Sequence, residues 1–236
     1  MKSLLLLCAL LLPLSTWAAS AKPAPTKTAS TIRATLSDMP IKEISKTSIP
    51  GIYELQVGDK IYYADKTGRH IINGHIFDTK NKQDLTAIRL ADLSRITWSE
   101  LPLEKAVVSG PKDGLKMAVF TDPDCPYCKN LEAQLVNIDG IRVYTFLFPL
   151  TQLHPDAYAK SESIWCAKDQ HQAMVDVMTK GTKLPKATCK TPIADIQQLA
   201  AKLNVQGTPT IFAADGRKYA GNVPLSQLKQ WLEQGQ

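Results

Sequence analysis

Hydrophobic residues in the second half of the chain occur first as a short unbroken run and then at helical spacing. The run Met117-Ala118-Val119-Phe120 is typical of a buried strand. Apolar residues then recur at helical spacing, at Leu131, Leu135 and Ile138, and residues 142–148 form a second apolar run. A strand, a helix and a strand in that order predict a βαβ unit.

Helical patterns dominate the next stretch, residues 155–203, with a break at residues 181–185. A strand pattern follows Pro209. Three leucines then line a closing helix: Leu225, Leu228 and Leu232. We therefore predict one mixed helix-and-sheet domain over residues 103–236, interrupted by an inserted helical subdomain.

The pattern between residues 20 and 83 indicates a small antiparallel sheet with one helix. Tyr53, Leu55 and Val57 alternate with polar residues, and two more extended segments follow after turns. Ahead of them, three apolar residues share one side of a short helix: Ile32, Leu36 and Met39. A domain of about 60 residues has a marginal core by itself, so we expect it to pair with a second copy.

Between these two domains, residues 84–102 are predicted to form a linker helix. Leu85, Ile88, Leu93 and Ile96 have helical spacing, and Pro102 ends the pattern. So few apolar residues cannot form a core of their own. We interpret this segment as a semi-rigid connector.

The first 19 residues have the pattern of a secretory signal peptide. A basic start is followed by an apolar run at residues 4–12, too short to span a membrane, and then by small residues. Cleavage is expected after Ala18 or Ala19, which also removes Cys8. We predict an exported protein that keeps four cysteines, an even number that suits disulfide chemistry.

Charge changes this picture little. The formal net charge of +6 falls to +5 without residues 1–19, because that segment holds one lysine and no acidic residue. The remaining basic residues are spread along the chain. This distribution is typical of a solvated surface, and we expect no nucleic-acid partner.

The most informative motif is Cys125-Pro126-Tyr127-Cys128, which lies between the buried strand and the helix after it. Cys125 is expected at the helix N-cap, where free backbone N–H groups and the helix dipole favour a thiolate. Pro126 suits the first helical position, since its missing N–H is not needed there. Cys128 lies one turn further on. An exposed, attackable thiolate beside a resolving thiol is what thiol–disulfide exchange requires.

Two other roles for the motif are less favoured. A structural zinc site would need further ligands, but Cys166 and Cys189 are isolated and no second Cys-x-x-Cys is present, so we expect no metal. A purely structural disulfide across three positions would close too small a loop to stabilise much. A redox-active Cys-x-x-Cys beside a βαβ pattern predicts a thioredoxin-like domain.

Cys166 and Cys189 lie within the helical insertion, 23 positions apart. A disulfide between them would contribute about 3 kcal/mol by loop closure. We interpret them as a structural disulfide, and the alternative is two free buried cysteines.

Taken together, these segments resemble the DsbC/DsbG family of periplasmic thiol–disulfide proteins over essentially the whole chain. The resemblance rests on Gly68 to Gly74, Phe120-Thr121-Asp122, the Cys-x-x-Cys motif, Ile164 to Asp169 and Gly207-Thr208-Pro209. The Trp165-Cys166-Ala167 segment with the later Cys189, and Thr208 before Pro209, resemble DsbC. The dipeptide Pro126-Tyr127 instead matches DsbG, which leaves the redox potential and substrate preference open.

The resemblance implies an α+β protein with a cystatin-like N-terminal dimerisation domain and a thioredoxin-like catalytic domain. It implies a periplasmic homodimer without a cofactor, kept reduced by a DsbD-like membrane protein. Cys125 would attack, Cys128 would resolve the mixed disulfide, and Pro126 and Tyr127 would support the site. Thr208 and Pro209, whose peptide bond can be cis, would bind substrate backbone.

The function favoured on these grounds is reduction and reshuffling of incorrect disulfides in exported proteins. The first alternative is a DsbG-like reductase of sulfenylated cysteines with chaperone activity. A holdase chaperone that does not need its thiols is a third hypothesis. A DsbA-like oxidase is less favoured, because that class lacks the N-terminal domain.

Overall fold

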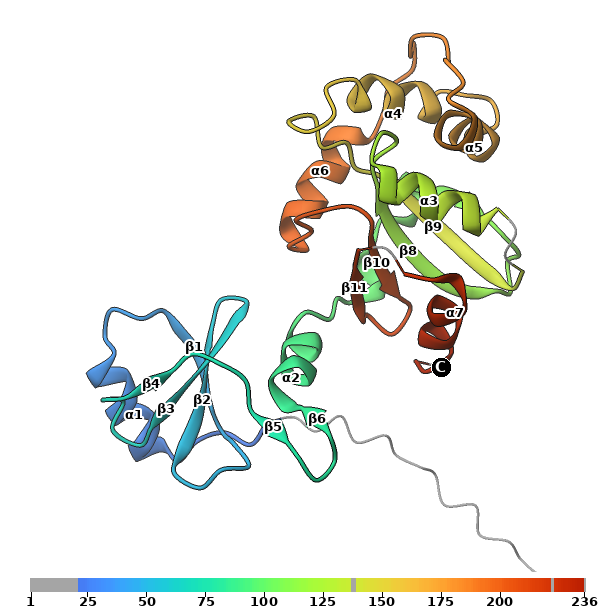
Figure 1. Cartoon of the computed structure of the whole chain (residues 1–236). Coiled ribbons are helices and arrows are strands. Elements are labelled where there is room, and N and C mark those ends of the chain that lie inside the picture. The colour runs from blue at the N-terminus through green and yellow to red at the C-terminus, as the bar shows by residue number, and fades with distance from the viewer. Residues whose placement is uncertain (1–20, 137–138, 222, 236) are drawn as a thin grey trace, which may run out of the picture. The chain divides into compact units, whose positions relative to one another are not determined.

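The computed structural model describes residues 21–136, 139–221 and 223–235 (Figure 1). The predicted signal peptide, residues 1–19, and Ile138 of the predicted helix lie outside these residues. The chain divides into two compact units, the first ending at Thr86 and the second beginning at Ala87. No helix in the described part of the chain has both the length and the apolar character needed to cross a membrane.

The N-terminal unit is an antiparallel sheet with one helix packed on it. Its elements are α1 (Thr26–Thr35), β1 (Ile41–Lys46), β2 (Ile52–Val57), β3 (Lys60–Asp65) and β4 (Ile71–Ile72). The four strands pair in sequence order, each antiparallel to the next, so the predicted meander is confirmed. Ile32 of α1 is fully buried with Ile44 and Leu55 of the sheet.

The strand predicted from the alternation at Tyr53, Leu55 and Val57 is β2, and its polar residues are buried as well. Glu54 and Gln56 are only 8% and 5% exposed, although the polar side of an alternating strand commonly faces solvent. Tyr63, the cross-strand neighbour of Glu54, is buried too, and its hydroxyl shares a 2.5 Å hydrogen bond with the hydroxyl of Thr86. The chain that leaves the unit through β5 (Phe77–Asp78) and β6 (Gln83–Asp84) therefore covers part of this face at Thr86.

The predicted linker helix over residues 84–102 is shorter than expected. Helix α2 (Leu85–Leu93) ends nine residues early, and two short 3₁₀ turns follow at Trp98–Glu100 and Leu103–Lys105. Ile96 does not continue the helix, because its backbone N–H donates to Gly216 O at 3.0 Å. Leu101 is buried in the core of the C-terminal unit, so these apolar side chains belong to that core and not to a helix face.

The C-terminal unit is built on a five-stranded sheet in the order β11-β10-β8-β9-β7. The strands are β7 (Val107–Ser109), β8 (Leu115–Thr121), β9 (Ile141–Leu147), β10 (Thr210–Ala213) and β11 (Lys218–Ala220). Only β8 and β9 among these pairs run parallel, and α3 (Pro126–Leu135) connects them. The predicted βαβ unit is thus at the centre of the sheet.

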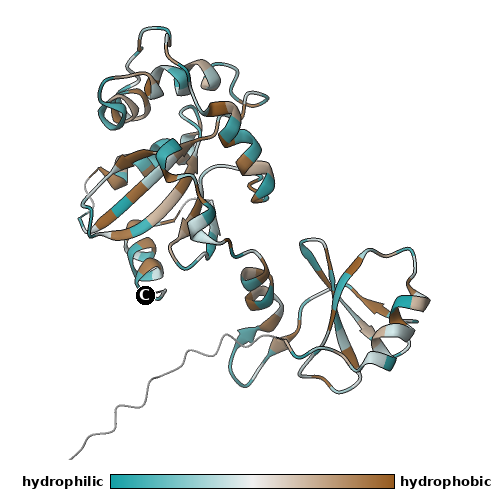
Figure 2. Cartoon of the chain, turned by 180° about the vertical axis from the view of Figure 1, so that it is seen from behind, coloured by the Kyte–Doolittle hydropathy of each residue, from teal (hydrophilic) through white to brown (hydrophobic). Residues whose placement is uncertain are grey.

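Both faces of this sheet are covered, because successive residues of β8 point in opposite directions. Met117 and Val119 pack in one cluster with Leu131 of α3 and with α7 (Leu225–Glu233). Phe120 packs on the other face, stacked on Phe146 with ring centroids 5.0 Å apart. Figure 2 shows brown hydrophobic and teal hydrophilic residues alternating along the helices.

The predicted helical insertion consists of three helices. They are α4 (Ala157–Trp165), α5 (Gln170–Lys180) and α6 (Ile193–Lys202). Apolar residues of all three join the Phe120 face of the sheet. A disulfide joins Cys166, at the end of α4, to Cys189 in the loop before α6.

A buried carboxyl group lies where α3 packs against α5. Glu132 of α3 is 5% exposed, and burial raises its pKa to about 7. Its Oε1 is 3.8 Å from Nε2 of His171 on α5, and burial lowers the pKa of that imidazole. Both groups are therefore held toward their neutral forms, and the contact is not a strong ion pair at neutral pH.

This burial predicts how the stability of the C-terminal unit depends on pH. Because the folded-state pKa of Glu132 lies above its usual 4.5, folding is penalised progressively as pH rises from about 4.5 to about 7. Glu132→Gln removes this penalty, so its free energy of unfolding relative to the parent should increase by up to about 3 kcal/mol between pH 4.5 and pH 8.

Urea unfolding followed by tryptophan fluorescence measures this difference, since every tryptophan after residue 19 lies in the C-terminal unit. Glu104→Gln, at an exposed glutamate of the same unit, is the matched control and should show no such trend. Parallel pH profiles for Glu132→Gln and the parent would contradict the prediction.

Candidate active site

The Cys-x-x-Cys motif lies at the junction between the central strand and the first helix of the C-terminal unit. Strand β8 ends at Thr121, and α3 begins at Pro126 with Cys125 as its N-cap. The backbone of Cys125 is extended, and its carbonyl accepts the first helical hydrogen bond, from Lys129 N–H at 3.0 Å. Proline at the first helical position fits because no N–H is lost there.

Both cysteines of the motif are free thiols, and they differ in their surroundings. Cys125 is the more accessible, but at 6% exposure it is far more covered than the sequence led us to expect. The cover includes the loop before β10, because the Cys125 thiol donates to the Thr208 carbonyl oxygen at 3.4 Å. Attack on a client disulfide therefore requires the client to approach along this loop.

Cys128 is almost inaccessible, with 1% exposure. Burial raises the pKa of its thiol to about 12, and hydrogen bonds from the Thr121 hydroxyl and the Asp122 N–H offset only part of that effect. The Asp122 N–H lies 3.5 Å from Cys128 Sγ. At neutral pH Cys128 is therefore a protonated thiol, unable to act as a nucleophile until its proton is removed.

A residue that the sequence reasoning did not assign to the site, Asp122, holds the loop in place. Its side chain is fully buried and accepts the backbone N–H of Asp124 at 2.7 Å and that of Leu150 at 2.6 Å. His154 Nδ1 lies 3.0 Å from the same carboxylate. A buried carboxylate requires such partners, so Asp122 ties the loop before Cys125 to the chain after β9.

Asp124, the residue before Cys125, forms an ion pair with the helical insertion. Lys160 of α4 approaches its two carboxylate oxygens at 2.6 and 2.8 Å, and Lys129 of α3 lies 3.6 Å away. Their position in the sequence could have pointed to both aspartates, because each lies within three residues of Cys125 and just after a buried strand.

Their partners Leu150, His154 and Lys160 lie 28 to 36 positions away, and no sequence pattern pointed to them.

The structure places Thr208 beside the motif, with its carbonyl 3.4 Å from Cys125 Sγ, and Pro209 follows it. Their peptide bond is cis. A cavity of about 470 Å³ is lined by this loop and by Tyr127, whose side chain is largely exposed. Cys166 and Cys189 are paired with each other and take no part in this arrangement.

Within the described ranges, no group of three or more histidine, cysteine or acidic residues is arranged to hold a metal ion. The thiol pair places one sulfur at a helix N-cap and a more deeply buried sulfur one turn away, an arrangement that suits thiol–disulfide exchange.

Two family profiles match the chain. Residues 18–87 match the disulfide bond isomerase protein N-terminal domain, and residues 102–236 match the thioredoxin-like domain. The first match covers the N-terminal unit, and the second covers the C-terminal unit from residue 102 onward.

Curated relatives agree with these matches. A probable thiol:disulfide interchange protein DsbC of Bordetella parapertussis is 38% identical over 183 residues, which are 77% of this chain and 65% of that protein. The chain thus spans a little under two thirds of the length of this relative. The thiol:disulfide interchange protein DsbC of Escherichia coli K12 is 31% identical over 209 residues, or 87% of each chain.

A solved structure supports the assignment for part of the chain. The disulfide interchange protein from Neisseria gonorrhoeae is 38% identical, with a TM-score of 0.54, and the match covers 58% of this chain and 99% of that one. Taken with the two domain matches and the similarity to the Escherichia coli relative over 87% of each chain, this means that the chain belongs to the DsbC family of thiol:disulfide interchange proteins.

Proposed function

We propose that this protein reduces and reshuffles incorrect disulfide bonds in exported proteins, with Cys125 as the attacking sulfur and Cys128 as the resolving one. The observation that carries the proposal is the asymmetry of the pair. Cys125 is the N-cap of α3 and keeps 6% of its surface exposed, whereas Cys128 is 1% exposed and its thiol has a pKa of about 12.

The proposed cycle begins when the Cys125 thiolate attacks one sulfur of a client disulfide. A Cys125–client disulfide forms, the client disulfide breaks, and the second client sulfur leaves as a thiolate that takes up a proton. If another client thiol attacks the mixed disulfide, Cys125 is released and the client is isomerised without net electron transfer. Cys128 does not take part in that route.

Net reduction requires Cys128. After losing its proton it attacks Cys125 Sγ, the client leaves as a dithiol, and the enzyme keeps a Cys125–Cys128 disulfide. Because burial keeps Cys128 protonated, this step is held back, and a mixed disulfide persists long enough for the client to rearrange. Two electrons from a DsbD-like membrane reductant would then restore the dithiol.

Client docking is assigned to the cavity beside Thr208 and Pro209. Tyr127 offers an exposed aromatic side chain there. The Thr208 carbonyl, which accepts from the Cys125 thiol, becomes free for a client N–H once that thiol has reacted. The alternative client is a sulfenic acid, which the Pro126-Tyr127 dipeptide favours because it matches DsbG. The Cys125 thiolate would attack the sulfenic sulfur, a Cys125–client disulfide would form, and the S–O bond would break with hydroxide leaving as water.

We propose the periplasm as the compartment in which this protein works. We also propose that two chains form a homodimer through their N-terminal units. Strand β4 forms an edge of the unit's sheet and pairs only with β3 among the described strands. Ile71 and Ile72 are 42% and 51% exposed on it. An exposed edge with two apolar side chains is a site for pairing with a second copy.

Single cysteine variants test the mechanism. Cys125→Ala should abolish both isomerisation of a scrambled multi-disulfide protein and net reduction, because no attack can begin. Cys128→Ala should lose net reduction, keep part of the isomerisation, and accumulate covalent client complexes on non-reducing gels. The Cys166–Cys189 disulfide is the same in both variants, so it contributes equally to their mobility on the gel. Full isomerase activity in Cys125→Ala would contradict the thiol mechanism and favour the chaperone hypothesis.

A charge placed on the β4 edge tests the dimer. Ile72→Lys should raise the dimer dissociation constant about tenfold or more, because a two-fold interface brings the new charge close to its copy. Light scattering across a dilution series measures this. Ile49→Lys is the matched control, since Ile49 is similarly exposed, at 45%, but lies outside the strands. Equal dimer dissociation constants for Ile72→Lys and Ile49→Lys would show that the dimer does not form through β4.

A further inference from the structure

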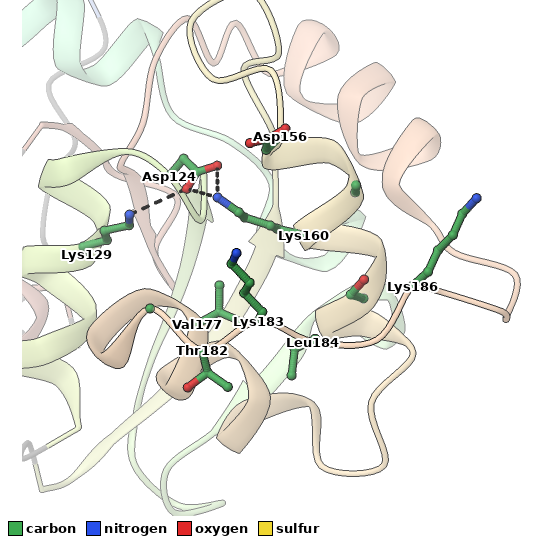
Figure 3. A pocket seen from close by; sticks show the side chains of 12 residues that line it. Asp124, Lys129, Asp156, Lys160, Val177, Thr182, Lys183, Leu184 and Lys186 are labelled. Atoms are coloured by element: carbon green, nitrogen blue, oxygen red, sulfur yellow. Dashed lines mark hydrogen bonds and ion pairs between the residues drawn. The ribbon is translucent and has the colours of Figure 1, made fainter.

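A second cavity, of about 430 Å³, lies next to the Cys-x-x-Cys motif within the C-terminal unit (Figure 3). Its wall includes Asp124, the residue before Cys125, and Lys129, the residue after Cys128. The rest of the wall comes from α4, from the end of α5 and from the loop after it. It shares no lining residue with the cavity beside Thr208 and Pro209, so it is a separate site.

Positive charge predominates in this cavity. Four lysines and two aspartates line it, which gives a formal charge of +2. The aspartate nearest the motif, Asp124, is already engaged by Lys160 at 2.6 Å and by Lys129 at 3.6 Å. It therefore has little capacity left to neutralise a third ammonium group.

Two of the lysines have no ion-pair or hydrogen-bond partner in the described chain. They are Lys183 and Lys186, both exposed on the loop after α5. Figure 3 shows Lys183 extending toward Lys160 and Asp124, while Lys186 points away from them. Positive charge thus remains available at this cavity for an incoming anionic group.

The same cavity has an apolar floor. Val177 of α5 and Leu184 of the following loop contribute to it (Figure 3). Its volume is in the range of sites that hold a few side chains or a small ligand. The combination of apolar floor and unneutralised ammonium groups fits a peptide segment that carries a carboxylate, and not a bare inorganic anion.

We propose that this cavity binds an acidic side chain of the client, close in sequence to the client cysteine that reacts with Cys125. This inference rests on the proposed function. An extended peptide advances about 3.3 Å per residue, so a residue about two to four positions from the reacting cysteine reaches the cavity that starts at Asp124. Lysines on flexible stems accept carboxylates in varied positions, which suits clients of differing sequence.

The test uses the full-length mature protein and two fluorogenic peptides. Each peptide has one cysteine held in a mixed disulfide, and its flanking positions are glutamate in one peptide and glutamine in the other. The measured quantity is the ratio of kcat/KM for the glutamate peptide to that for the glutamine peptide. Reduction of the glutamine peptide tests the proposed function separately, because it does not depend on the cavity.

The parent protein should prefer the glutamate peptide, and the Lys183→Gln/Lys186→Gln variant should lower this preference about two- to tenfold. High salt should reduce the preference of the parent, since the lysines are exposed. Lys112→Gln removes one charge, at an exposed lysine on the loop between β7 and β8; it is the control for charge outside the cavity and should leave the preference unchanged.

A cysteine-to-serine version of the glutamate peptide gives an independent measurement, because it can bind but not react. It should inhibit the parent competitively and inhibit the double variant less. The proposal is overturned if the parent shows no preference for glutamate, or if the preference is the same in the double variant. If Lys112→Gln lowered the glutamate preference as much as the double variant does, the proposal would also be overturned, since the preference would then follow from overall charge.

Discussion

The active site depends on one buried carboxylate, that of Asp122. It is fully covered and accepts two backbone N–H groups, one from the motif loop and one from the chain after β9, with His154 as a third partner. A carboxyl group is tolerated in such a buried place only when its surroundings supply hydrogen-bond donors. Two segments distant in sequence, the motif loop and the chain after β9, are therefore held together where β8 ends, directly before α3 and Cys125.

This junction also determines how deeply the sulfurs of Cys125 and Cys128 are buried. The start of α3 places Cys125 at the surface end of the helix and turns Cys128 into the core, against Thr121 and the Asp122 backbone. A buried thiol beside a more accessible one favours slow resolution over fast release. In the proposed cycle, slow resolution is what gives a client time to reshuffle its disulfides before net reduction.

Local sequence patterns predicted the strand–helix–strand unit, the position of Cys125 and Pro126 at the helix start, and the antiparallel N-terminal sheet. Features that depend on tertiary contact were missed. The linker helix ends at Leu93 because Ile96 and Leu101 join the core of the C-terminal unit, and Glu54 is buried because the chain at Thr86 lies over its face. The roles of Asp122 and Asp124 depend on His154, Leu150 and Lys160, and no local pattern pointed to those partners.

The central claim, that the two thiols are unequal, is tested most directly by alkylation of the fully reduced protein at neutral pH. The modified protein is digested at intervals, and mass spectrometry of the peptide holding both cysteines locates the label. We expect Cys125 to be labelled first and Cys128 to stay unlabelled until the protein unfolds, because its thiol is buried with a pKa of about 12. Labelling of Cys128 in the folded protein as fast as Cys125 would contradict this account.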